Sequence, residues 1–120
     1  MKSMFENCAK AQTIDVSNFN TQKVKDMSYM FYGCYDLEKL ELSNFDKSQT
    51  TTINNMFKNC YELVSLDISK FNTKNVVDMS NAFSGLEKVI SLDTSKFDTS
   101  KVTDMSCMFQ SCSELIFVLK

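Results

Sequence analysis

Residues 101 to 112, KVTDMSCMFQSC, place two methionines and two cysteines within twelve positions. Thioether and thiolate sulfurs bind soft metal ions, and cysteines carry redox chemistry, so the stretch could form a metal or redox site. The same side chains are also ordinary components of a hydrophobic core. Which interpretation holds depends on the elements that would have to bring further ligands to this place.

The composition excludes several classes of function. The chain of 120 residues has no histidine, which is the commonest general base and metal ligand. Its net charge is -2 with scattered lysines, and no apolar run approaches the roughly 20 residues that span a bilayer. No nucleophile with a base and no phosphate-binding loop can be recognised. We therefore expect no enzyme, no cofactor or metal, no nucleic acid partner and no membrane insertion.

The sequence repeats every 26 residues, and such repeats determine the fold class. We predict a single domain, 1–120, with a partial unit at 1–13 and full units at 14–39, 40–65, 66–91 and 92–117, while 118–120 start the next unit. Two columns of phenylalanine carry the period: Phe19, Phe45, Phe71 and Phe97 form one, and Phe5, Phe31, Phe57, Phe83 and Phe109 form the other.

Two patterns within each unit predict two elements. Leu40 and Leu42 alternate with polar residues, as in a strand with one buried face, and the other units repeat this. Methionines and phenylalanine follow at helical spacing, as in Met27, Met30 and Phe31, which predicts a short buried helix stripe. The column that ends this stripe holds residues that tolerate a left-handed backbone: Asn7, Gly33, Asn59, Gly85 and Ser111.

A strand and a three-turn helix cannot bury a core alone, so the units must stack. The predicted fold is an α/β repeat: a solenoid with one short parallel strand and one short helix in each 26-residue unit, and its sheet on the concave side. The segments SNFNTQKVKDMSYMFYGC and SKFDTSKVTDMSCMFQSC resemble the repeat of the BspA-like leucine-rich repeat surface proteins. The resemblance implies a right-handed leucine-rich-repeat solenoid, located at a microbial cell surface or secreted, that adheres to host proteins and has no shared catalytic residues.

The period also separates the sulfur-containing residues into columns. Cys8, Cys34, Cys60 and Cys112 share one column, whose fourth place is held by Leu86, as expected of a small buried side chain. A disulfide between neighbours in this column is the alternative. Met105, Met108 and Phe109 are assigned to the buried stripe, whereas Cys107 lies outside both columns, and we expect its thiol to be exposed.

Acidic residues occupy an outward position of each predicted strand, with serine two residues later. We predict that this strip, on the concave face, binds a basic region of an extracellular or host protein, with the exposed Tyr29, Tyr32 and Tyr35 adding contact area. A solvated, partly lysine-paired face and a calcium site are alternatives for the strip, and a structural spacer in a longer array is the alternative function. The strip consists of Asp15, Glu41, Asp67, Asp93, Ser17, Ser43, Ser69, Ser95 and Lys39.

The C-terminal segment LIFVL is apolar on both faces of its predicted strand. Phe117 and Leu119 stand at outward positions that other units fill with polar residues. An uncapped strand edge with apolar side chains favours pairing with another chain. We therefore predict end-to-end self-association through these two residues, with the terminal strand of a longer array as the alternative.

Overall fold

The regular secondary structure of the described chain consists of two short parallel strands. The computed structural model describes residues 1–45 and 49–119. Strand β1 (Ser91–Asp93) pairs with strand β2 (Phe117–Leu119), and Leu92 lies opposite Val118. Within these two ranges there is no helix. Elsewhere, extended segments meet at isolated parallel bridges, for example between Thr13 and Lys39.

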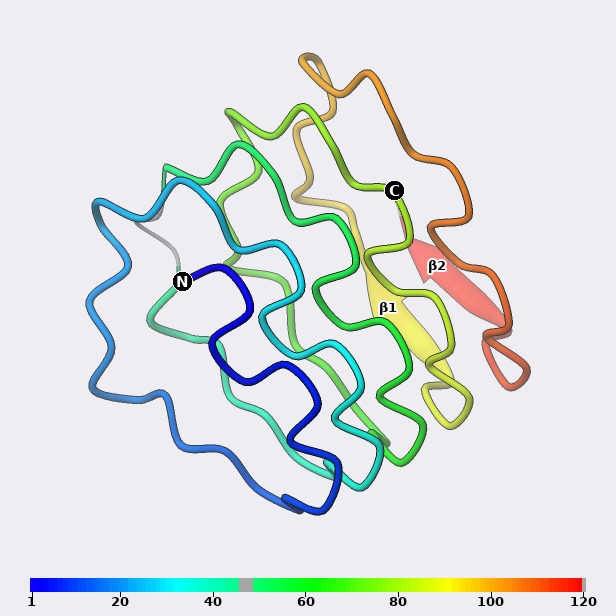
Figure 1. The fold of residues 1–120 in the computed structure, drawn as a ribbon. Helices are drawn as coiled ribbons and strands as arrows, with labels where there is room; N and C mark the ends of the chain where they lie inside the picture. Colours follow the sequence, from blue (N-terminus) through cyan, green and yellow to red (C-terminus); the bar gives the residue numbers. More distant parts are fainter. Residues whose placement is uncertain (46–48, 120) are drawn as a thin grey trace.

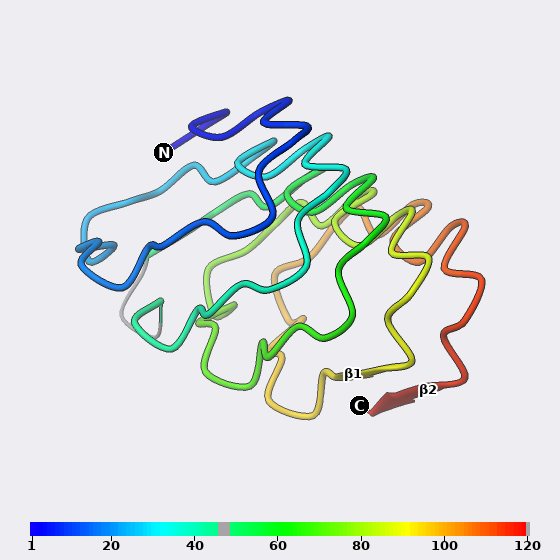
Figure 2. The ribbon, with the colours of Figure 1, turned by 90° about the horizontal axis from the view of Figure 1, so that it is seen from below.

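The predicted α/β solenoid of the leucine-rich-repeat class is therefore wrong. The described ranges contain no helix, and their two strands form a two-stranded sheet instead of a continuous concave one. The chain folds into a compact body of 31 × 30 × 20 Å. Segments that follow one another in sequence lie side by side from the N-terminal to the C-terminal end (Figure 1). The two ends of the chain lie on opposite sides of the molecule (Figure 2).

Runs of successive turns take the place of the predicted helices. We call them turn runs; they cover 2–7, 28–33, 54–59, 80–85 and 106–111. Alternate N–H groups donate to the carbonyl three residues back, as from Tyr32 to Tyr29 at 3.1 Å. The N–H groups between them donate to the next turn run, as from Phe31 to Met56 at 2.9 Å. Each run is thus bonded within itself and to its neighbour.

Left-handed residues make this backbone possible. Each turn run has two positions with positive φ, for example Tyr29 at 59° and Gly33 at 71°. Both stand third in a four-residue turn, where a type II turn requires positive φ. The left-handed backbone predicted for the glycine column is confirmed, although it lies inside a turn run instead of at a helix end. The complete set is Ser3, Asn7, Tyr29, Gly33, Asn55, Asn59, Asn81, Gly85, Cys107 and Ser111.

The close spacing of the segments explains why helices do not form. Paired extended segments lie about 4.8 Å apart, whereas an α-helix with its side chains is about 10 Å wide. The rings of Phe31 and Phe57 stack with centroids 5.6 Å apart, which holds consecutive turn runs at a comparably short distance. A turn run is narrow enough for this spacing, and it also directs alternate N–H groups to its neighbour.

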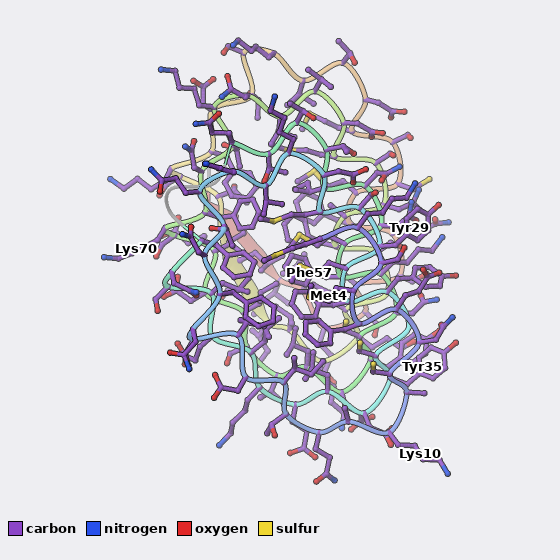
Figure 3. All side chains as sticks on the ribbon, turned by 60° about the vertical axis from the view of Figure 1, so that its left-hand side comes forward. Met4, Lys10, Tyr29, Tyr35, Phe57 and Lys70 are labelled. Carbon is purple, nitrogen blue, oxygen red and sulfur yellow. The ribbon has the colours of Figure 1, made fainter. Side chains whose placement is uncertain are left out.

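The core contains the apolar residues that the sequence placed there. Met27, Met30 and Phe31 are fully buried, and Phe57 is only 1% exposed. Figure 3 shows Phe57 in the interior of the molecule, between the outer edges. The predicted alternation is also present, because Leu40 and Leu42 are buried on either side of exposed Glu41. The apolar pattern therefore identified most of the core correctly, although it suggested the wrong backbone.

Candidate protein-binding surface

The predicted acidic strip lies on the surface, and its aspartates hold local turns. Asp67 accepts hydrogen bonds from the N–H of Ser69 at 2.9 Å and from its hydroxyl at 2.6 Å. The equivalent N–H bond, at 2.9 Å, joins Ser17 to Asp15 and Ser95 to Asp93. These are Asx turns, in which a side chain caps the backbone two residues on. Exposed members are Asp15, Glu41, Asp67, Asp93, Ser17, Ser43, Ser95 and Lys39, and Ser69 is half-buried.

The serine donors also change the acidity of the strip. The hydroxyl and N–H of the following serine hold the pKa of Asp15, Asp67 and Asp93 below its ordinary value of 3.8. Lys70 lowers the pKa of Asp67 in addition, while the neighbouring charge of Asp93 raises it. These three aspartates therefore remain charged under mildly acidic conditions.

We expect the melting temperature of the chain to fall as the pH decreases below about 4. Because the folded-state pKa of these aspartates lies below the unfolded value of 3.8, their bonds stabilise the fold above that value. This stability is lost as the pH falls through the folded-state pKa. Melting curves followed by circular dichroism would measure the slope of melting temperature against pH.

A variant with Asp15→Asn, Asp67→Asn and Asp93→Asn should show a shallower slope, since asparagine keeps the acceptor oxygen but does not titrate. The control is Glu6→Gln, which removes an exposed carboxyl that accepts no hydrogen bond from the described residues. An identical slope in the triple variant and the parent chain would contradict the role of the serine bonds.

Four tyrosines form a second surface feature, which we call the tyrosine surface: Tyr29, Tyr32, Tyr35 and Tyr61. The exposure predicted for Tyr35 is confirmed, whereas that predicted for Tyr29 and Tyr32 is wrong, because both are half-buried, as is Tyr61. The rings of Tyr29 and Tyr32 lie 5.4 Å apart, and those of Tyr35 and Tyr61 stack at 5.2 Å. Figure 3 shows Tyr29 and Tyr35 on one outer edge and Lys70 on the opposite edge. The sequence analysis missed Tyr61, although its spacing of 26 from Tyr35 indicated the pair.

The cysteine column lies against the core, and its thiols are hydrogen-bonded across turn runs. Cys34 donates to the carbonyl of Phe5 and Cys60 to that of Phe31, both at 3.2 Å. All five cysteines are free, so the alternative of a disulfide within the column is not realised. Burial raises the pKa of the Cys34 thiol to about 11 and also raises that of Cys60. The exposure predicted for Cys107 is confirmed.

Comparison with known proteins places the chain in a family. The family model described as "Mycoplasma protein of unknown function, DUF285" matches residues 1–117. The chain belongs to the DUF285 family. No curated protein and no solved structure matches this DUF285 chain. Because the match covers nearly the whole chain, all of the surfaces described above lie within the family's shared region.

The described part of this DUF285 member contains neither a metal-binding cluster nor a membrane-spanning helix. In the described ranges, no three or more cysteine, aspartate or glutamate side chains are grouped so that they could hold a metal ion. The same part of the chain has no helix with the length and apolar character needed to cross a membrane. A hollow of about 280 Å³ is lined by side chains that do not titrate near neutral pH: Phe19, Asn20, Thr21, Gln22 and Asn44.

We expect the thiols of the DUF285 chain to react at very different rates. At pH about 8, Cys107 should be alkylated rapidly because it is exposed, whereas Cys34 and Cys60 should react only on unfolding, since thiolate is the reactive form. Mass spectrometry of peptides after timed exposure to iodoacetamide would measure this. Cys107→Ser should remove the fast phase, and rapid modification of Cys60 in the native chain would contradict its burial.

Proposed function

We propose that the chain is a non-catalytic recognition module of a cell-surface or secreted protein, and that it binds another extracellular protein. The observation that carries the proposal is the tyrosine surface, where two contacting ring pairs lie at one edge of the molecule. Tyrosine combines a large apolar ring with a hydroxyl, and it is enriched at protein interfaces for this reason. The resemblance to BspA-like surface proteins supports the proposed location and the proposed class of partner.

The acidic strip indicates that the proposed partner presents a basic region. Asp67 and Asp93 are close enough for the charge of one to raise the pKa of the other, so a basic region of a partner would relieve this repulsion. Their serine bonds keep the carboxylates in defined positions, which lowers the entropy lost on binding. The tyrosines would supply contact area and the strip would supply attraction that salt screens.

The test is a binding screen of the 120-residue chain against immobilised extracellular matrix proteins. Tyr35→Ser combined with Tyr61→Ser should raise the Kd of a partner at least about tenfold, because aromatic residues dominate interface energies. Circular dichroism must show that this variant remains folded. Unchanged affinity in the tyrosine variant would exclude the tyrosine surface as the binding site. Failure of the parent chain to bind any extracellular protein would overturn the proposal.

A second variant set tests the strip separately. Asp15→Asn, Glu41→Gln, Asp67→Asn and Asp93→Asn remove four charges while each aspartate replacement keeps its acceptor for serine. Binding through the strip should weaken in this variant, and the salt dependence of the parent's affinity should disappear. Binding that is unchanged would favour the alternative in which the strip serves only local turns. Failure of the parent chain to bind any partner would instead favour the second candidate function, a structural spacer.

A further inference from the structure

The hydrogen bonds between turn runs all have the same direction. Phe5 donates to the carbonyl of Met30 at 2.9 Å, Phe31 to that of Met56 at 2.9 Å, and Phe57 to that of Ala82 at 3.0 Å. The residues two positions to either side repeat the pattern, as in Asn7 to Tyr32 at 2.7 Å. Each run therefore offers N–H groups to the run that follows it and carbonyl groups to the run that precedes it.

The first and last turn runs have complementary free edges. At the C-terminal end, the N–H groups of Cys107, Phe109 and Ser111 have no acceptor among the described residues. At the N-terminal end, the carbonyls of Lys2, Met4 and Glu6 have no donor among the described residues. These six groups stand at the positions that the repeat pairs everywhere else in the chain, so one edge supplies the donors and the other the acceptors.

Apolar side chains are exposed at both edges as well. Met105 is 48% exposed, whereas Met79, which stands 26 residues earlier, is fully buried. The assignment of Met105 to the buried stripe is therefore wrong, because the described ranges contain no turn run beyond 106–111 that could cover it. Phe109 and Phe5 are the outer rings of a stack whose members lie 5.6 to 5.8 Å apart, and each is only partly buried. At both edges, apolar side chains that pack against the core are thus partly exposed to water.

We propose that the last turn run of one copy binds the first turn run of a second copy of this chain, in the register found between neighbouring runs. Cys107, Phe109 and Ser111 then donate to the carbonyls of Lys2, Met4 and Glu6 of the second copy. The ring of Phe109 stacks on Phe5 of the second copy and continues the phenylalanine stack. This interaction goes beyond the proposed function and leaves the tyrosine surface uncovered.

Charge complementarity supports a second copy of the chain as the partner. Within the chain, Lys88 donates to Glu62 at 2.5 Å, and the two residues are 26 positions apart. In the proposed register, Glu114 and Lys10 of the second copy have the same relation, with the acid in the earlier run and the lysine in the later one. The junction therefore places opposite charges together, as Glu62 and Lys88 are placed within the chain.

The interface uses two different faces, so the contact between two copies is not symmetric. A heterologous contact of this kind produces open chains of copies unless the rotation closes a ring. The prediction of self-association through Phe117 and Leu119 is different, because it rests on side chains that lie outside the described part of the structure. The contact between turn runs instead involves backbone and rings of the described residues.

Sedimentation velocity of the 120-residue chain over a wide concentration range tests the proposal. The average mass should increase with concentration above the 13.8 kDa of one copy. Amide exchange at Cys107, Phe109 and Ser111 should slow over the same range, since these groups become hydrogen-bonded. A constant mass of one copy at every concentration would overturn the proposal and leave a different polypeptide to cover these faces.

Mixing two variants distinguishes this geometry from a symmetric dimer. Phe109→Asp blocks the last turn run and Phe5→Asp blocks the first, so each variant alone should be a monomer. An equimolar mixture should form dimers and nothing larger, because one competent face of each kind remains. If either variant alone still dimerises, or if the mixture stays monomeric while both variants are folded by circular dichroism, the proposed pairing is wrong.

A charge exchange gives a test that leaves the buried rings intact. Lys10→Glu or Glu114→Lys alone should weaken association several-fold, because each places like charges at the junction. The double variant restores an opposite pair and should recover most of the affinity. Melting of the dilute monomer controls for effects inside one copy, where Lys88 also senses Glu114. A double variant as weak as the sum of the singles would overturn the proposed register.

Discussion

Replacing Phe57 with alanine is expected to lower the free energy of unfolding by about 3–5 kcal/mol. Phe57 is 1% exposed, and its ring stacks on Phe31 at 5.6 Å and on Phe83 at 5.7 Å. Alanine would leave a cavity in the middle of the stack and remove both ring contacts. Equilibrium denaturation in urea, followed by circular dichroism, measures the loss. Since domains are commonly stable by only 5–15 kcal/mol, Phe57→Leu provides a milder variant that remains folded.

Phe109→Ala is the matched control for this prediction, because Phe109 is the last ring of the same stack. It is only partly buried and contacts Phe83 on one side, at 5.8 Å. We expect a loss of about 1–2 kcal/mol in the dilute monomer, since less apolar surface returns to water. Equal losses for the two variants would show that the stack does not extend through the core as described.

Replacing Asn55 with valine should lower the free energy of unfolding by about 2 kcal/mol or more. Asn55 has a φ of 57°, and a β-branched residue is strongly disfavoured in this region. Relaxing the backbone would also break the bond from the N–H of Asn55 to the carbonyl of Ser80, at 2.9 Å. Because Asn55 lies in a central turn run, this change affects the contacts to both neighbours.

Asn55→Gly tests whether backbone conformation is the cause. Glycine adopts positive φ without steric cost, so this variant should lie within about 1 kcal/mol of the parent chain. Both variants are measured by urea denaturation under the same conditions. If glycine is as damaging as valine, the side chain of Asn55 matters more than its backbone, and the explanation given for the turn runs would need to change.

The candidate surfaces were only partly predictable from sequence. Exposure of Asp15, Glu41 and Asp67 followed from their alternation with buried residues, and the structure confirms it. The bonds from the serines to the aspartates depend on a turn that closes within three residues, which a column of side chains does not reveal. The pairing of Tyr35 with Tyr61 was available from their spacing, but contact between the rings depends on how closely the segments lie.

The amino-acid sequence by itself determined the 26-residue period, the residues of the core and the places where a left-handed backbone is tolerated. Met27, Met30 and Phe31 are buried because their spacing puts them on one side of any tightly turning backbone, helical or not. Only the tertiary structure decided which backbone that is. Stacking at the distance between Phe31 and Phe57 leaves too little room for a helix, so alternate N–H groups donate to the next segment. The energy of a hydrogen bond between segments depends on where the neighbouring segment lies, and a local sequence pattern does not specify that position.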